Sequence, residues 1–169
     1  MNLPPYSTFP NIIGDTITLR QIERDDINDI IPISFYDAVQ ANTAQEAISM
    51  QDKINRDYTN GDSIHWGIAE CVSNTIVGTC GYYRGFKNNA GELGCVLLPQ
   101  QQGKGFMTRA MLMAINFGFD TIGLQRIWAE TSVDNHSAIN LFERLNFTVA
   151  GQDNNSVIFE LHKDSVNGK

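Results

Sequence analysis

Short segments in which apolar residues alternate with polar ones, or run on for a few positions, recur along the chain between turn-forming residues. Such segments, rich in β-branched and aromatic side chains, are typical of β-strands. In the first of them, Ile17 and Leu19 share one face. Six segments fit the description: 16–22, 64–71, 75–86, 92–98, 124–130 and 156–162. The short turns between the second, third and fourth predict an antiparallel meander.

Apolar residues at helical spacing predict the helices. Thr43 and Glu46 fit a capping box ahead of an apolar stripe that an Asn-Gly pair ends. Asp25 and Asp26 are candidate N-caps for a shorter helix that Pro32 interrupts or ends. Two later helices are predicted by two sets of apolar residues: Met107, Ala110, Met111, Ala114 and Ile115, then Ala138, Leu141, Phe142 and Leu145.

The order of these elements predicts an α/β fold. An antiparallel first half followed by strand, helix, strand, helix and strand implies a mixed, mostly antiparallel sheet of six or seven strands, flanked by helices on both faces. A chain of 169 residues has the length of one domain. We therefore expect a single domain over 1–169, with an ordered core of about 14–163.

Composition and charge limit the partners. Hydrophobic residues make up 42% of the chain and charged residues 18%, as in ordinary globular proteins. The 12 basic and 19 acidic residues give a formal net charge of −7, which is the wrong sign for a phosphate backbone or an anionic membrane. We expect no nucleic-acid and no membrane partner, and an easier fit to a cationic partner such as an amine.

The cysteines and the chain start favour a cytoplasmic protein. Cys71, Cys80 and Cys95 form no CxxC or Cys/His cluster, so we expect buried thiols in a reducing compartment and no metal site. The first residues lack the pattern of a signal peptide, and no stretch approaches the roughly 20 apolar residues of a membrane span. A monomer and a homodimer are both compatible with the sequence.

Gly103 and Gly105 follow the predicted strand at 92–98 and open the next predicted helix. Backbone N–H groups at such a helix N-terminus suit a phosphate or pyrophosphate, and Lys104 adds a cation nearby. Taken alone, the two glycines also fit a plain strand-to-helix turn. A Walker A loop does not fit, because Leu98 stands where its first glycine belongs and Gly105 replaces its Ser or Thr.

The dinucleotide fingerprint GxGxxG fits this loop better. Thr108 occupies its third glycine position, and Glu130 ends the next strand as a ribose-binding acid would. About 90 residues precede the loop, however, and only 39 follow Glu130, too few for the rest of a doubly wound sheet. A Rossmann-type nucleotide-binding module therefore stays the weaker alternative.

The stretch from Glu92 to Ala110 resembles motif A of the GNAT superfamily of N-acetyltransferases, through Gln100, Gly103 and Gly105. The segment that starts at Thr16 resembles the branch that includes ribosomal-protein-alanine N-acetyltransferases. The superfamily's second signature is matched about thirty residues after motif A by Asn135, Ala138, Leu141, Phe142 and Phe147. The resemblance implies the acyl-CoA N-acyltransferase (GNAT) fold, with acetyl-CoA as co-substrate and a primary amine as acceptor, acetylated by direct attack in a ternary complex.

The resemblance also implies which residues hold acetyl-CoA. Asn135 would hydrogen-bond the pantetheine arm, although it also fits an N-cap of the following helix. The residues implied along the pantetheine are Cys95, Val96, Leu97 and Leu98, those around the pyrophosphate are Gln101, Gln102, Gly103, Lys104, Gly105 and Phe106, and Phe142 is a further contact.

Glu92 is the candidate general base, since the attacking amine must lose a proton; the alternative is an ordinary strand-end glutamate. The N–H of Cys95 or Val96 would stabilise the oxyanion. Phe142 and Ala138 stand where relatives often carry a proton-donating Tyr and a Ser. Three alternatives follow: the thiolate leaves unprotonated, another donor reaches it (Tyr82, Tyr83 or His136), or the protein binds CoA without transferase activity.

The acceptor is open between N-terminal peptide amines and small-molecule amines. We expect the segment 30–61 to form one wall of its cleft. His65 and His162 fit packed or surface positions better than catalysis, and Arg109 fits surface charge. Aromatic residues that could line the cleft, or equally belong to the core, are Phe35, Tyr36, Trp66, Tyr82, Tyr83 and Phe86.

Overall fold

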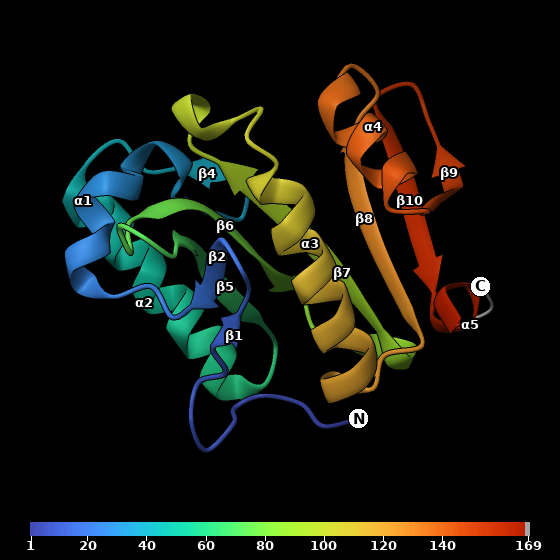
Figure 1. The fold of residues 1–169 in the computed structure, drawn as a ribbon, viewed down its shortest axis with the longest axis horizontal. Coiled ribbons are helices and arrows are strands. Elements are labelled where there is room, and N and C mark those ends of the chain that lie inside the picture. Colours follow the sequence, from blue (N-terminus) through green and yellow to red (C-terminus); the bar gives the residue numbers. More distant parts are fainter. Residues whose placement is uncertain (168–169) are drawn as a thin grey trace.

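An eight-stranded mixed sheet runs through the molecule in the computed structural model, which describes residues 1–167 (Figure 1). The strand order is β1-β2-β5-β6-β7-β8-β10-β9, and β3 pairs with β4 in a separate hairpin. All neighbours are antiparallel except β7 and β8. The strands are β1 Ile12–Ile13, β2 Ile17–Arg20, β3 Phe35–Tyr36, β4 Val39–Gln40, β5 Ile64–Glu70, β6 Ile76–Tyr83, β7 Ala90–Leu97, β8 Arg126–Ser132, β9 Thr148–Gln152 and β10 Ser156–His162.

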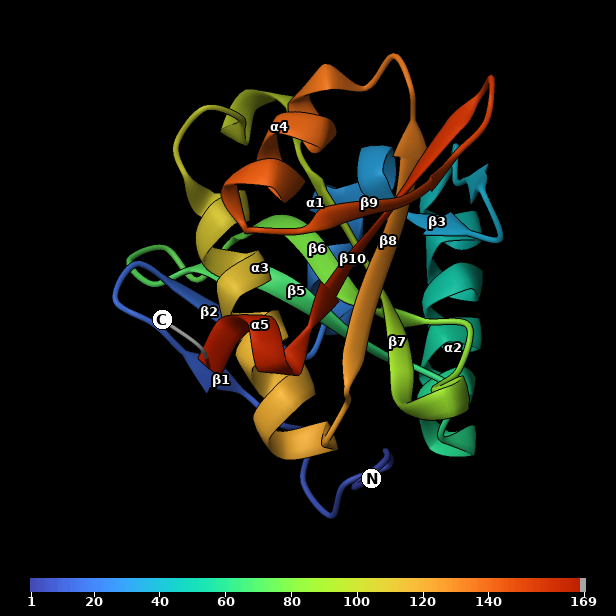
Figure 2. The ribbon, with the colours of Figure 1, turned by 90° about the vertical axis from the view of Figure 1, so that its right-hand side faces the viewer.

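Helices cover both faces of this sheet. Figure 2 shows the strands between α3 and α4 on one side and α2 on the other. The helices are α1 Ile27–Ile30, α2 Ala44–Asn60, α3 Phe106–Asn116, α4 His136–Arg144 and α5 Lys163–Asn167. Single 3₁₀ turns cover Arg24–Asp26, Ile31–Ile33, Lys87–Asn89 and Pro99–Gln101, and a π-helical turn, Phe117–Ile122, extends α3.

Two apolar clusters correspond to the two faces. The larger one packs α3 and α4 on the sheet, with Trp66 and Leu93 fully buried in it. The smaller one packs α1 and α2 on the opposite face and includes Ala47 and Leu98. Because strand side chains alternate between faces, neighbouring residues of one strand belong to different clusters.

The predicted fold class is confirmed, and the sheet has two strands that the sequence pattern does not reveal. β1 is only two residues long, and β9 is almost wholly exposed, so neither carries a buried alternation. Thr43 caps α2 as predicted, since its Oγ1 accepts from the N–H of Glu46, but the capping box is incomplete because the Glu46 carboxylate accepts from the N–H of Asn42 rather than from that of Thr43. Asp26 does not cap α1 with its side chain; its carboxylate accepts from the Glu23 N–H and pairs with Arg20.

One cysteine differs from expectation. Cys80 is buried and Cys95 half-buried, but Cys71 is exposed, because β5 ends at Glu70 and Cys71 falls in the turn that follows. All three are free thiols. Within residues 1–167, no helix is both long and apolar enough to cross a membrane.

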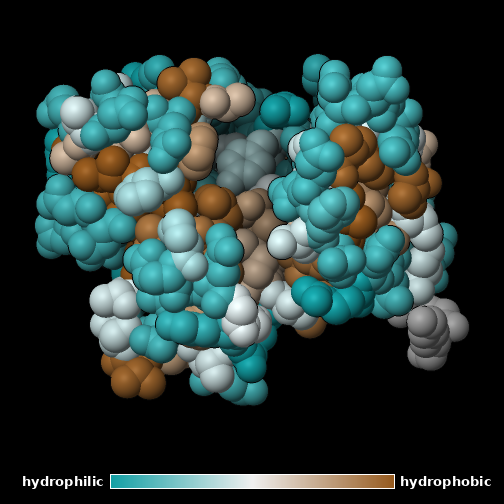
Figure 3. Space-filling model, turned by 90° about the horizontal axis from the view of Figure 1, so that it is seen from above, coloured by the Kyte–Doolittle hydropathy of each residue, from teal (hydrophilic) through white to brown (hydrophobic). Residues whose placement is uncertain are grey.

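The sheet opens between its two parallel strands. β7 and β8 pair only at the start, from Ala90 opposite Arg126 to Glu92 opposite Trp128. Beyond this point they diverge, so the splay begins after Glu92. Figure 3, which looks down on the open end, shows a hollow between the part that carries α1 and α2 and the part that carries α4.

Candidate active site

Glu92 is the last residue of β7 that pairs with β8, and the hollow begins there. Its side chain is 13% exposed, and its Oε1 lies 3.2 Å from Nη1 of Arg84. Its Oε2 is buried without a hydrogen-bond partner in the described part of the chain. Burial raises the pKa of this carboxyl group, and Glu130 on β8 raises it further, while Arg84 lowers it. A carboxylate with a raised pKa is a better proton acceptor than an exposed one.

The edge of β7 beyond Glu92 presents backbone groups to the hollow. The N–H of Leu98 donates to Val77 on the β6 side. Because N–H groups point to alternate edges of a strand, those of Cys95 and Leu97 face the opposite edge, toward β8. That edge has no ladder partner after Glu92 in the described residues, so an extended chain could pair with it like an added strand.

The four residues implied for the pantetheine divide between the two faces of β7. Cys95 and Leu97 pack against the larger apolar cluster. Val96 lines a pocket on the other face, and Leu98 is buried in the smaller cluster. What Cys95 and Leu97 offer the hollow is therefore backbone rather than side chain.

The loop after β7 has the shape of an anion site. Gly103 and Gly105 have φ angles of 77° and 78°, a left-handed conformation that suits glycine. Gly105 is the N-cap of α3, an eleven-residue helix whose first N–H groups are free of side-chain caps. Lys104 is exposed beside it and donates to Gln101 Oε1 at 2.8 Å. Gln102 is exposed in the same loop, whereas the side chain of Phe106 is buried in the core.

Arg109 is exposed, as expected of a surface charge, and adds a second cation beside this loop. Its Nη1 donates to the carbonyl oxygen of Lys104 at 3.3 Å. The same atom lies 3.1 Å from where a Cβ on Gly105 would be. The sequence signal for this contact is the spacing of four residues between Gly105 and Arg109, which on a helix places the Arg109 side chain near the N-cap residue.

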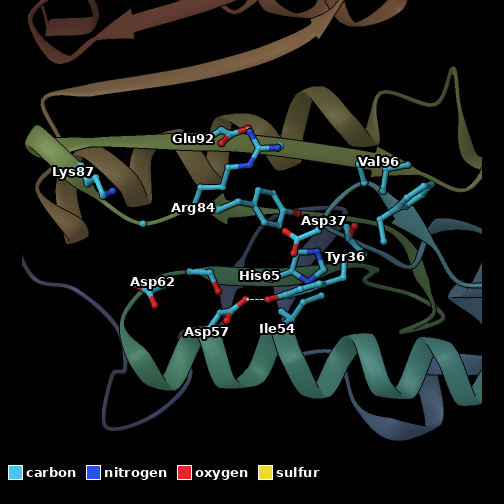
Figure 4. Close-up of a pocket in the computed structure, with 17 residues that line it drawn as sticks. Tyr36, Asp37, Ile54, Asp57, Asp62, His65, Arg84, Lys87, Glu92 and Val96 are labelled. Atoms are coloured by element: carbon cyan, nitrogen blue, oxygen red, sulfur yellow. Dashed lines mark hydrogen bonds and ion pairs between the residues drawn. The ribbon is translucent and has the colours of Figure 1, made fainter.

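A pocket opens on the other face of the sheet, with Glu92 on its wall (Figure 4). Its volume is about 570 Å³. Residues of the segment 30–61 line this pocket through the β3–β4 hairpin and α2, and its role as the acceptor cleft stays a prediction. Of the aromatic candidates, Phe35, Tyr36 and Tyr83 line the pocket, and Trp66, Tyr82 and Phe86 belong to the core. The strands, α2 and the turn after β6 contribute Ile54, Asp57, Asp62, Ser63, His65, Thr79, Arg84, Gly85, Lys87, Gly94 and Val96.

Carboxylates outnumber cations around this pocket. Asp37, Asp57, Asp62 and Glu92 line it together with Arg84 and Lys87, and a third cation, Lys53, lies 5.1 Å from the centroid of the Tyr36 ring. Asp57 accepts a hydrogen bond from the Tyr36 hydroxyl at 3.0 Å, which fixes the hairpin against α2. The lining therefore favours a positively charged ligand.

The second signature lies on α4, beside the hollow. Asn135 caps this helix, its Oδ1 accepting from the Ala138 N–H at 3.2 Å. Phe142 is only 4% exposed and packs against Phe147 and Phe159. The structure thus shows the capping role of Asn135 and the core position of Phe142; whether either touches a bound co-substrate stays a prediction.

The alternative proton donors occupy three different environments. The hydroxyl of Tyr82 is buried and donates to the carbonyl oxygen of Ala114. His136 is exposed at the start of α4. Tyr83 lines the pocket next to Glu92, and burial raises its pKa well above the ordinary tyrosine value. Only Tyr83 shares a cavity with the candidate base.

Comparison with known proteins decides the family. A family model described as an acetyltransferase (GNAT) domain matches residues 16–148. The chain belongs to the GNAT acetyltransferase family. This N-acetyltransferase is 26% identical over 151 residues to the uncharacterised N-acetyltransferase YoaA of Bacillus subtilis, a match that covers 85% of each chain.

Other relatives of this acetyltransferase carry more specific names. A spermidine N(1)-acetyltransferase of Escherichia coli is 30% identical over 78 residues, which is 46% of this chain and 38% of that protein. The solved structure of mutant forms of the spermidine/spermine N-acetyltransferase SpeG of Vibrio cholerae has a TM-score of 0.75. It is 16% identical and covers 90% of this chain and 97% of its own, so it supports the fold alone.

The residues present fit the co-substrate of this family. GNAT acetyltransferases use acetyl-CoA, whose pyrophosphate requires N–H donors and cations and whose pantetheine requires an open strand edge. The loop at Gly103 and Gly105, with Lys104 and Arg109, provides the first. The edge at Cys95 provides the second. In residues 1–167, no group of three or more His, Cys, Asp or Glu is placed to hold a metal ion.

Proposed function

We propose that this enzyme transfers an acetyl group from acetyl-CoA to a primary amine of a cationic acceptor, with Glu92 as the general base. The observation that carries the proposal is the position of Glu92. It stands where the β7–β8 splay begins and at the same time lines the acidic pocket. A donor on one side of β7 and an acceptor on the other would meet beside this carboxylate.

Glu92 and the backbone of β7 have separate roles in the proposed reaction. Glu92 takes one proton from the acceptor's ammonium group, directly or through a water, and the neutral amine attacks the thioester carbonyl. Between the two N–H groups considered for the oxyanion, alternation along β7 favours Cys95, whose N–H faces the hollow, as the donor to the carbonyl oxygen. The attack forms the C–N bond and a tetrahedral oxyanion; the C–S bond then breaks, the CoA sulfur leaves with the electron pair, and the nitrogen loses its second proton to that thiolate or to water.

The environment of Cys95 supports direct attack by the amine. Burial raises the pKa of its thiol to about 12, so the thiol is protonated and a poor nucleophile. An acetylated cysteine is therefore not part of the proposed reaction. A leaving thiolate, with a pKa near 8.5, departs without obligatory protonation, and of the three candidate proton donors Tyr83 is the one that shares the pocket with Glu92.

The acceptor follows from charge. Four carboxylates against two cations in the pocket lining favour an amine that carries a further positive charge. The name of one relative, the spermidine N(1)-acetyltransferase of Escherichia coli, supports a small polycationic amine over a peptide. An N-terminal peptide amine is the competing acceptor class.

The test is acetyl-CoA consumption by the wild type and by Glu92→Gln, with diamines, polyamines, aminoglycosides and N-terminal peptides as acceptors. We expect turnover of small cationic amines and a loss of about 10²- to 10⁴-fold in Glu92→Gln. The loss should be larger at neutral pH than at high pH, where free amine is abundant. Tight CoA binding without turnover of any amine would make Phe142 and Ala138 marks of a non-catalytic CoA-binding protein.

A further inference from the structure

The acceptor pocket has a second polar end, on β5, that the proposed reaction does not use. Three buried side-chain atoms in residues 1–167 have no hydrogen-bond partner: Ser63 Oγ, His65 Nδ1 and Glu92 Oε2. All three residues line this one pocket. Buried polar groups in folded proteins are almost always paired, so their gathering in a single cavity indicates a ligand that supplies the partners.

One end of the pocket is on β7 and the other at the start of β5, and β6 lies between these two strands. His65 on β5 lies opposite Gly81, and Gly81 lies opposite Gly94 on β7. Two inter-strand spacings of about 4.8 Å place the backbones of the two outer strands roughly 10 Å apart. The pocket therefore runs across the strands from Glu92 to Ser63.

The rings of Tyr83 and His65 form the floor in the middle of this path. A Cβ on Gly94 would lie 2.8 Å from the ring of Tyr83 and one on Gly81 would lie 3.2 Å from the ring of His65, so these glycines let the two rings lie close to the sheet. The Tyr83 ring, in turn, lies 5.5 Å from the ring of His65. Figure 4 shows His65 between the side chains of α2 below and Glu92 above. A slender ligand fits this floor better than a branched one.

The chemistry of the β5 end suits a cation. Ser63 is 5% exposed and follows Asp62, and Asp57 approaches from α2. Burial lowers the pKa of His65 to about 4, so at neutral pH the imidazole is uncharged and does not repel an ammonium group. A ligand that ended in a carboxylate or phosphate would instead meet two carboxylates here.

We propose that Ser63 and His65 bind the second nitrogen of the acceptor, so that the enzyme acetylates linear diamines or polyamines whose two nitrogens span this pocket. The inference rests on the proposed function, which places the reacting amine at Glu92. Ser63 and His65 are positioning residues in this scheme. They select the acceptor by its length and its second N–H group, and take no part in proton transfer.

The experiment compares α,ω-diamines of about three to eight methylene groups with monoamines of equal length. In the wild type we expect one diamine length to exceed its matched monoamine at least about tenfold in kcat/KM, because a site built for a hydrogen-bonding group rejects the analogue that lacks it. Ser63→Ala and His65→Phe should lower that ratio about fivefold or more, mainly by raising KM for the diamine. Ser49→Ala, which removes an exposed hydroxyl of α2, is the matched control.

Each outcome has a separate meaning. Transfer to amines with no diamine preference in the wild type overturns the inference and leaves the proposed function standing; this measurement needs no folded variant. A diamine preference that persists in both variants also overturns it, since the second nitrogen would then be bound elsewhere. No transfer to any amine would instead remove the proposed function itself.

Discussion

Arg84 Nη1 lies 3.2 Å from Glu92 Oε1, a pairing between a side chain that is 66% exposed and one that is 13% exposed. The guanidinium therefore stands at the solvent side of the candidate base and leaves Oε2, on the buried side, without a partner. Two opposed effects set the protonation of this carboxyl group: burial raises its pKa, and the positive charge of Arg84 lowers it. The net direction is upward.

Removing Arg84 is expected to move the acid limb of the pH profile. In Arg84→Gln the opposing charge is lost, so the pKa of Glu92 rises further and the base is protonated over a wider range. The acid limb of kcat/KM should shift to higher pH, while activity above about pH 9 stays within about twofold of wild type. Lys87→Gln, which alters another pocket cation, is the control. An unmoved acid limb would show that Glu92 does not limit the reaction.

Local signals predicted the strand, loop and helix around the donor site well. Pro99, Gly103 and Gly105 restrict the backbone whatever surrounds them, so the end of β7 and the start of α3 follow from a few residues. The residues predicted to surround the pyrophosphate, 101–106, lie together in this loop for the same reason. The surface position of Arg109 was also predicted, but its contact with the Lys104 carbonyl was not, because that contact depends on a side-chain conformation.

The acceptor pocket was harder to foresee, because it depends on strand register. Gly94 leaves room for the Tyr83 ring beside Glu92 only because β6 and β7 pair in this register, and no spacing in the sequence reveals that alignment. The β3–β4 hairpin that closes one wall turns at Asp37 and Ala38, both with positive φ, where no glycine marks a turn. Ser63 and His65 acquire meaning only once they share a cavity with Glu92.

The buried carboxylate is expected to lower the stability of the fold. The folded-state pKa of Glu92 is raised, so its contribution becomes unfavourable as pH rises above the unfolded value of about 4.3 and is fully unfavourable above the folded pKa. Glu92→Gln should therefore unfold at a higher temperature than wild type near pH 7.5. The difference should narrow as pH falls toward about 4, as thermal unfolding at several pH values would show. A lower unfolding temperature at pH 7.5 would contradict this.

Gly103 and Gly123 offer a matched pair for testing the pyrophosphate loop. Both have left-handed φ, 77° and 84°, and an added Cβ at either would meet no atom closer than 3.8 Å. Gly103→Ala and Gly123→Ala should each lower stability by roughly 1 kcal/mol, through the backbone conformation alone. We expect only the Gly103 variant to weaken CoA binding, about tenfold, in a calorimetric titration. Equal affinities would place the pyrophosphate elsewhere.

The two roles of Asn135 can be separated by choosing the replacement. Asn135 Oδ1 accepts from the Ala138 N–H, and a serine preserves such a cap while an alanine does not. Asn135→Ala should therefore lose about 1 kcal/mol of stability, and Asn135→Ser should stay close to wild type. If the amide also holds the pantetheine, both variants should raise KM for acetyl-CoA about three- to tenfold, because neither side chain carries an amide. A KM that rises in Asn135→Ala but not in Asn135→Ser would leave the helix cap as the only role, and the effect on acetyl-CoA would then come from fraying of α4.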